Sequence, residues 1–303
     1  MTPTQVRPTQ RLKSILSARQ AIVIPGAANA LFARLIEDLG FEVCYVTGAG
    51  IANMQLGAPD IGLVTLTELA DQVAAMAEAV ELPLLVDADT GFGNAVNVVR
   101  TVRVLERAGA AGIQLEDQVF PKKCGHFAGK AVVPLAEMIG KVKAAVDARR
   151  DGDLQIVART DARAVLGLDA AIERAQAMIE AGADVTFVEA PTSRAEIERI
   201  LRELPVPQVV NVVFGGRTPE VAQQDMKELG AGMVLYANAA LQAAIAGTQE
   251  VLSALKRDGS LAAVRGQLAS FDERQRILRK AEFDTLETRY AADERAQPDR
   301  TVD

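Results

Sequence analysis

Short apolar runs alternate with longer amphipathic segments along most of this chain of 303 residues. Each run is four or five residues long and lacks the apolar–polar alternation of a strand with one wet face. Such runs are typical of parallel strands that are buried on both faces. The pattern predicts eight strands: Ala21–Ile24, Val43–Thr47, Leu84–Asp87, Ile113–Glu116, Gln155–Arg159, Val185–Glu189, Gln208–Asn211 and Met233–Tyr236.

The amphipathic segments between these runs have the spacing of helices, and several are followed by a glycine, which favours a helix C-terminus. The predicted helices are Asn29–Leu39, Thr67–Val80, Ala95–Ala108, Leu135–Arg149, Asp169–Ala181, Arg194–Leu204, Pro219–Leu229 and Asn238–Leu255.

Eight strand–helix units of this kind predict an α/β protein with the (β/α)8 barrel fold. The alternative is a doubly wound open sheet, which usually has fewer strands, and no glycine-rich turn follows the first strand here. We therefore expect one barrel domain over residues 1–303. The more polar segment 261–303 is expected to add a C-terminal helix and a frayed end at Gln297–Asp303.

The amino-acid composition argues against several classes of binding partner. Hydrophobic residues make up 49%, which is enough for a large core, and the net charge is -7 with no tryptophan. An acidic chain with few aromatic residues argues against nucleic acid as a partner. No apolar stretch approaches the ~20 residues of a membrane span, and residues 1–20 lack the apolar core of a signal peptide. We expect a cytoplasmic protein without a membrane partner.

The stretch Lys122-Lys123-Cys124-Gly125-His126 contains the only histidine and one of two cysteines. Flanking ammonium and imidazole groups favour a thiolate, so this sulfur is suited to moving a proton near neutral pH. The alternative is a loop thiol without a role. Cys44 lies inside an apolar run and is interpreted as a packing residue.

Carboxylates end two neighbouring predicted strands. Asp87 and Asp89 are two residues apart, so on a strand they face the same way, and Glu116 ends the next strand. Oxygen ligands of this kind suit Mg²⁺, with Mn²⁺ as a second possibility. The alternative is that these acids are solvated and cap helices.

Polar residues also end the later strands. Arg159 is placed to bind a carboxylate at two points, or to form an internal ion pair with Glu189 or Asp161, and the two interpretations are compatible. Asn211 ends the seventh strand. The segment Gly48–Gly50 is either a plain turn or a set of backbone N–H groups open to an anion.

Two predicted loops, 48–66 and 118–134, are longer than a barrel requires. Both follow strands, at the end where barrels carry their active sites.

Several motifs together resemble those of the isocitrate lyase/phosphoenolpyruvate mutase superfamily, and the segment around Cys124 resembles its lyase branch, which includes methylisocitrate and 2,3-dimethylmalate lyases. The motifs are Tyr45–Gly50, Leu56–Asp60, Val86–Gly93, Gln114–Asp117, Lys122–His126 and Ala158–Ala162.

The resemblance implies a Mg²⁺-dependent enzyme, usually a homotetramer, whose last helix packs against a neighbouring subunit and whose Cys124 loop closes over the substrate. It implies metal binding at Asp87, with Asp60, Asp89 and Glu116 acting mostly through water. The candidate catalytic residues are Tyr45, Glu116, Lys122, Cys124 and His126. The candidate substrate-binding residues are Thr47, Gly48, Ala49, Arg159, Glu189 and Asn211.

The reaction that the resemblance implies is retro-aldol cleavage of a small 2-hydroxy dicarboxylate, with Cys124 protonating the carbanion. Methylisocitrate lyases carry a hydroxyl residue and an acid shortly after the asparagine, whereas this chain has Asn211 followed by Val212, Val213 and Phe214. Because these side chains cannot hydrogen-bond a carboxylate, we expect a 3-alkylmalate such as 2,3-dimethylmalate. The alternatives are a methylisocitrate lyase, oxaloacetate cleavage, C–P bond chemistry and a non-enzymatic metabolite-binding barrel.

Overall fold

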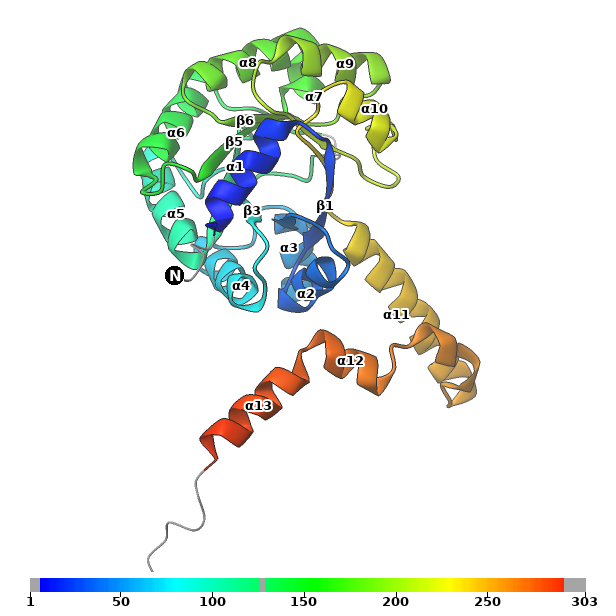
Figure 1. Ribbon diagram of the computed structural model, residues 1–303. Coiled ribbons are helices and arrows are strands. Elements are labelled where there is room, and N and C mark those ends of the chain that lie inside the picture. The colour runs from blue at the N-terminus through cyan, green and yellow to red at the C-terminus, as the bar shows by residue number, and fades with distance from the viewer. Residues whose placement is uncertain (1–5, 126–128, 292–303) are drawn as a thin grey trace, which may run out of the picture. The chain divides into compact units, whose positions relative to one another are not determined.

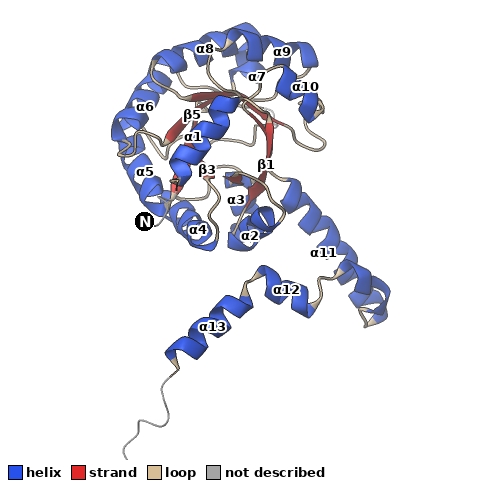
Figure 2. Ribbon diagram, in the orientation of Figure 1, coloured by secondary structure: helices blue, strands red, loops and turns tan. Residues whose placement is uncertain are grey.

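The structure is a computed structural model that describes residues 6–125 and 129–291. Its sheet consists of eight parallel strands, which agree with the eight apolar runs (Figure 2). Their bounds are β1 (Ile22–Ala27), β2 (Cys44–Val46), β3 (Leu84–Asp87), β4 (Ala110–Glu116), β5 (Gln155–Thr160), β6 (Val185–Val188), β7 (Val209–Asn211) and β8 (Met233–Tyr236).

The strand order is β6-β5-β4-β3-β2-β1-β8-β7, so each strand lies beside its sequence neighbours. The two end strands, β6 and β7, approach each other through a parallel bridge between Thr186 and Gln208. There the Thr186 hydroxyl donates to Gln208 Oε1 at 2.8 Å, and its backbone N–H donates to Pro207 O at 3.2 Å. The sheet is therefore a nearly closed barrel, which confirms the predicted barrel and excludes the open sheet.

Helices surround the strands as predicted, and three helices in the barrel unit were not predicted. The bounds are α1 (Pro8–Ala18), α2 (Ala30–Asp38), α3 (Gly48–Leu56), α4 (Leu66–Ala79), α5 (Ala95–Ala108), α6 (Leu135–Ala148), α7 (Ala162–Leu166), α8 (Leu168–Glu180), α9 (Arg194–Glu203), α10 (Gln223–Glu228) and α11 (Ala239–Asp258). The unexpected ones are α1, α3 and α7.

Two of these helices lie at the ends of the barrel. Helix α1 begins with Pro8 and lies across one end of the ring of strands (Figure 1), where Leu12 and Leu16 complete the core inside the barrel. Helix α3 occupies the predicted loop after β2. The glycines there suggested a loop, but the Thr47 hydroxyl accepts a hydrogen bond from Gly50 N at 3.1 Å and caps the helix.

The core has an inner and an outer layer. The inner layer fills the barrel with side chains from the strands and α1, including Tyr45 and Phe187. A larger outer layer lies between the strands and the surrounding helices. Because all strands are parallel, the polar residues at their carboxyl ends gather at one rim.

By its internal contacts the chain divides into two compact units, Met1–Ala246 and Gly247–Asp303, with the boundary inside α11. The second unit continues with a 3₁₀ turn η1 (Ala262–Gln267), α12 (Phe271–Ile277) and α13 (Lys280–Tyr290). The single extra helix expected after residue 261 is thus three short pieces, and Ser270 starts a new one by accepting a hydrogen bond from Glu273 N. The predicted frayed end, 297–303, lies outside the described residues. Within the described ranges, no helix is long and apolar enough to cross a membrane.

Candidate active site

A cavity of about 180 Å³ lies where the carboxyl ends of the strands meet. It collects side chains from β2, β3, β5 and β7 and from the segment that follows β4. The predicted site residues that line it are Tyr45, Thr47, Ala49, Asp60, Asp87, Lys122, Cys124, Arg159, Glu189 and Asn211. Gly48, Asp89 and Glu116 lie directly behind this lining, as the contacts below show. His126 lies outside the described residues.

On one side of the cavity an acidic cluster surrounds Lys122. Its Nζ lies 2.5 Å from Asp60 Oδ1 and 2.7 Å from Asp89 Oδ1, and its side chain is 3% exposed. Burial first, and then the charges of Asp87 and Asp60, raise the pKa of Asp89 to about 7 although Lys122 lowers it. Burial favours a neutral amine, but the carboxylates, Asp89 foremost, raise the pKa of Lys122 well above its usual value. Lys122 is thus paired with two carboxylates and lies within the field of a third, Asp87, so negative charge is in excess.

This cluster has the chemistry of a site for a hard divalent cation. No three His, Cys, Asp or Glu side chains in the described ranges are arranged to enclose an ion by themselves. Mg²⁺ does not need such a cage, because it keeps several waters and binds one or two carboxylates. Gly48 lies against the cluster: a Cβ added to it would be 3.3 Å from both Asp87 Oδ2 and Asp89 Oδ1. Nearby, Glu116 Oε1 is buried without a hydrogen-bond partner among the described residues.

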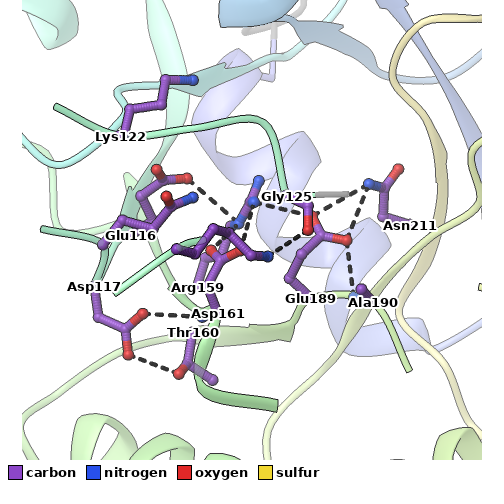
Figure 3. A network of polar contacts seen from close by, with 12 residues as sticks. Glu116, Asp117, Lys122, Gly125, Arg159, Thr160, Asp161, Glu189, Ala190 and Asn211 are labelled. Atoms are coloured by element: carbon purple, nitrogen blue, oxygen red, sulfur yellow. Dashed lines mark hydrogen bonds and ion pairs between the residues drawn. The ribbon is translucent and has the colours of Figure 1, made fainter. Parts of the chain in front are cut away.

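Arg159 is at the centre of a second network (Figure 3). Its Nη2 lies 3.1 Å from Glu189 Oε2, and its Nε lies 3.0 Å from Asp161 Oδ2 and 3.4 Å from Glu116 Oε2. The guanidinium carbon is 5.1 Å from the centre of the Phe187 ring. Burial disfavours the charge, but the carboxylates, Asp161 foremost, raise the pKa of Arg159 well above its usual value. The internal ion pair is therefore present, and the same cation lines the cavity.

A buried amide side chain, Gln114, extends the site. Tyr45 donates its hydroxyl hydrogen to Gln114 Oε1 at 3.0 Å, and Gln114 Nε2 donates to Asp87 Oδ1 at 3.1 Å. Burial, followed by the charge of Asp87, raises the pKa of Tyr45 well above its usual value. Gln114 was not a predicted site residue because it lies inside an apolar run, where a single amide belongs to no recognisable motif. It connects the phenol to the candidate metal ligand.

Strained backbone accompanies the site. Asp89 and Ala190 are not glycine, yet both have the left-handed conformation, with φ of 48° and 57°. Ala190 N donates to Glu189 Oε1 at 2.8 Å, and Asn211 Nδ2 donates to Glu189 Oε2 at 3.3 Å. Strain of this kind concentrates at functional sites. Asn211 Oδ1, by contrast, is buried without a hydrogen-bond partner in the described part of the chain.

The two cysteines differ in their surroundings. Cys44 is fully buried in the outer core, and burial raises its pKa to about 12, so it is a packing residue. Cys124 is half-buried and lines the cavity. Its neighbour Lys123 donates from Nζ to Gly129 O at 2.9 Å, while Gln118 bonds both backbone groups of Lys123.

A parallel barrel with carboxylates, a guanidinium and a thiol around one cavity at the carboxyl ends of its strands defines a site for small acids. Residues 12–256 match the protein family described as phosphoenolpyruvate phosphomutase. The chain belongs to this phosphoenolpyruvate mutase/isocitrate lyase superfamily. Within it, the chain is a carbon–carbon lyase of the oxo-acid type.

The relatives show the degree of similarity. The chain is 44% identical over 281 residues to 2,3-dimethylmalate lyase of Eubacterium barkeri, covering 93% of this chain and 97% of the relative. It is 45% identical over 254 residues to a 2-methylisocitrate lyase of Aeropyrum pernix, covering 84% and 82%.

Solved structures agree. A crystal structure of 2,3-dimethylmalate lyase superposes with a TM-score of 0.89 at 31% identity and covers 99% of this chain and 100% of the other. Phosphonopyruvate hydrolase in complex with oxalate and Mg²⁺ superposes with a TM-score of 0.86 at 32% identity, covering 95% and 100%.

Proposed function

We propose that this lyase cleaves 2,3-dimethylmalate to pyruvate and propionate with the help of Mg²⁺. The reaction breaks the bond between C2 and C3. The 2-hydroxyl loses its proton and becomes the carbonyl of pyruvate, and C3 gains a proton and becomes the methylene carbon of propionate. The similarity to 2,3-dimethylmalate lyase over nearly the whole chain supports this substrate class.

The observation that carries the proposal is the segment after β7. Val213 and Phe214 line the cavity next to Asn211, and Leu235 and Ala237 add further apolar surface. Phe214 lies at the mouth of the cavity with 78% of its surface exposed. A carboxylate against Val213, Leu235 and Ala237 would find no hydrogen-bond donor among these side chains, whereas a methyl group needs none. The cavity therefore favours an alkyl substituent at C3.

Asp87 would hold Mg²⁺, with Asp60, Asp89 and Glu116 acting through water. The excess of negative charge around Lys122 and the unpartnered Glu116 oxygen support this assignment. A structure of a relative in complex with Mg²⁺ supports it too. When bound, the ion supplies positive charge that stabilises the developing oxyanion and lowers the pKa of hydroxyl groups beside it.

The chain's own groups would bind the substrate and move its protons. Gly48 and Ala49 begin α3, so their N–H groups have no acceptor within the helix and can meet the substrate carboxylate together with Arg159. Glu116, whose Oε1 is unpartnered among the described residues, would accept the 2-hydroxyl proton beside the neutral phenol of Tyr45, and Cys124 would donate the proton to C3.

Release of 2-oxo acid tests this function. Purified protein with Mg²⁺ should release pyruvate from 2,3-dimethylmalate with a kcat/KM well above that for methylisocitrate, isocitrate or oxaloacetate. Turnover of methylisocitrate above 2,3-dimethylmalate would overturn the proposed substrate and favour the second candidate, a methylisocitrate lyase, which the 45% identity to such an enzyme supports.

A double substitution should weaken this preference. Val213→Thr with Phe214→Glu places a hydroxyl and an acid after Asn211, as in methylisocitrate lyases. The ratio of kcat/KM for 2,3-dimethylmalate to that for methylisocitrate should fall by roughly 10–200-fold, the usual effect of changing apolar pocket contacts. Leu63→Thr, an exposed apolar residue that does not line the cavity, is the control and should leave the ratio unchanged.

We also propose that the protein is a homotetramer in which the C-terminal helices pack against a neighbouring subunit. Support comes from large apolar side chains that are exposed in the second unit: Leu252, Leu255, Phe271, Phe283, Leu286 and Tyr290. Residues of this kind in one segment favour a protein interface. Sedimentation velocity should give a tetramer, and Phe283→Glu with Leu286→Glu should lower the mass, whereas a monomeric wild type would contradict the proposal.

A further inference from the structure

Lys130 makes a buried contact that its position in the sequence does not suggest. Its ammonium donates to the backbone carbonyl of Gly125 and lies 2.5 Å from Asp161 Oδ1. The Lys130 side chain is 2% exposed and that of Asp161 is fully buried. A buried lysine that bonds both a carboxylate and a carbonyl fixes the two relative to each other.

Asp161 is itself held firmly. Its carboxylate accepts from Arg159 Nε and Nη2, and its backbone N–H donates to Asp117 Oδ1 at 2.9 Å. Arg174 Nε in turn donates to Asp117 at 2.9 Å. Burial alone would raise the pKa of Asp161, but Arg159 and then Lys130 hold it below its usual value. One carboxylate is therefore shared by the guanidinium in the cavity and by Lys130.

The backbone that Lys130 holds lies directly against this guanidinium. A Cβ added to Gly125 would overlap Arg159 Nη2 and lie 2.7 Å from Glu189 Cδ. Figure 3 shows Gly125 beside this network. Since Gly125 follows Cys124 in the chain, the position of this peptide also sets the position of the thiol. Lys123 makes no equivalent link among the described contacts, because its ammonium bonds the carbonyl of Gly129.

We propose that Lys130 is a positioning residue for the cleavage reaction: by joining the Gly125 carbonyl to Asp161, it fixes the Cys124 thiol relative to the substrate-binding Arg159. The catalytic part of this assignment rests on the proposed function, in which Cys124 donates a proton and Arg159 binds a carboxylate. The contact itself involves neither the metal cluster nor the apolar side of the cavity.

Lys130→Met tests the assignment, with Lys141→Met as the matched control. Lys141 is equally buried and bonds the Thr90 carbonyl at 3.0 Å, but it does not contact Asp161. Lys130→Met should lower kcat/KM on the best substrate by about 10², the expected effect of a misplacement of about 1 Å at the reacting groups. Lys130→Arg keeps the positive charge and has enough N–H groups to bond both the Gly125 carbonyl and Asp161. It should therefore recover most of this loss. Lys141→Met should stay within about threefold of wild type.

Gly125→Ala provides a second route that removes no charge. The added methyl group should displace the same peptide from Arg159 and lower kcat/KM to a similar extent, so this variant decides the matter if Lys130→Met does not fold. Fold is checked by the midpoint of urea unfolding. Wild-type kinetics in a folded Lys130→Met or in Gly125→Ala, or an equal loss in Lys141→Met, would overturn the proposal.

A readout without turnover separates this proposal from the proposed function. Iodoacetamide should alkylate Cys124 in ligand-free Lys130→Met roughly tenfold faster than in wild type, as measured by peptide mass spectrometry, with buried Cys44 as the internal reference. Such acceleration in a protein that cleaves none of the tested acids would support the positioning role and reject the substrate. An unchanged alkylation rate in a folded variant would reject the positioning role even if turnover is found.

Discussion

Replacing Asp87 with alanine is expected to abolish turnover while leaving the protein folded. Asp87 lies at the end of β3, lines the cavity and accepts a hydrogen bond from Gln114. A bound divalent ion is worth several kcal/mol of charge stabilisation in the transition state, and each 1.36 kcal/mol is tenfold in rate. We therefore expect kcat to fall by about 10³-fold or more, and chelation of the wild type to do the same.

Calorimetric titration with Mg²⁺ distinguishes loss of the metal from loss of the fold. Asp87→Ala and the isosteric Asp87→Asn should both show weakened Mg²⁺ binding with an unfolding midpoint close to that of wild type. Asp71→Ala removes an exposed carboxylate from α4 and should change neither quantity. Full activity of Asp87→Ala in buffer treated with chelator would contradict the metal assignment.

The strands could be predicted from the sequence because each one is buried on both faces. A run such as Leu84–Asp87 has to be apolar until its last residue, where it emerges at the rim, so the pattern gives both the strand and its functional end. Helix α1 has no such signal: its turns are mostly polar, and Leu12 and Leu16, with Ile15 beside them, fill the end of the barrel. Helix α3 was missed because its glycines weaken helix propensity, while Thr47 and the packing around it stabilise the helix.

The same reasoning explains which site residues could be predicted. Asp87, Glu116 and Arg159 interrupt apolar runs at their ends, and a charge in that position is conspicuous. Gln114 and Lys130 are not, since an amide within a strand and a lysine at the end of a loop have ordinary surroundings in the sequence. Their significance depends on partners distant in the chain, Tyr45 with Asp87 for Gln114 and Asp161 for Lys130, which only the fold brings together.

The structure changes the electrostatic reasoning around the thiol. In the sequence, two ammonium groups flank Cys124, but in the fold Lys122 bonds Asp60 and Asp89 and Lys123 bonds the carbonyl of Gly129. The charge of Lys122 is therefore compensated mainly by the acidic cluster. The argument for Cys124 as a proton donor is its position in the cavity. It lines the same cavity as the acidic cluster, and the next residue in the chain, Gly125, packs against Arg159.

Cys124→Ser is accordingly expected to fold, to bind Mg²⁺ and substrate, and to lose a factor of about 10²–10⁴ in kcat, the usual contribution of a positioned general acid or base. Serine is close to cysteine in size and also carries one hydrogen on its side-chain heteroatom. Its hydroxyl, however, is a far weaker acid than a thiol. Cys44→Ser should keep kcat nearly unchanged because Cys44 lies in the outer core, although it should lower stability by placing a hydroxyl there.

The direction in which kcat changes with pH identifies the proton donor. A thiol can protonate the C3 carbanion only while it holds its own proton, so kcat should decrease as pH rises through the pKa of Cys124 in the substrate complex. This decrease should be absent from the residual activity of Cys124→Ser, since a serine hydroxyl does not ionise in the accessible range. Near wild-type kcat in Cys124→Ser on the best dicarboxylate would reject the assignment. A basic limb that persists unchanged in the variant would assign the proton to another group that lines the cavity.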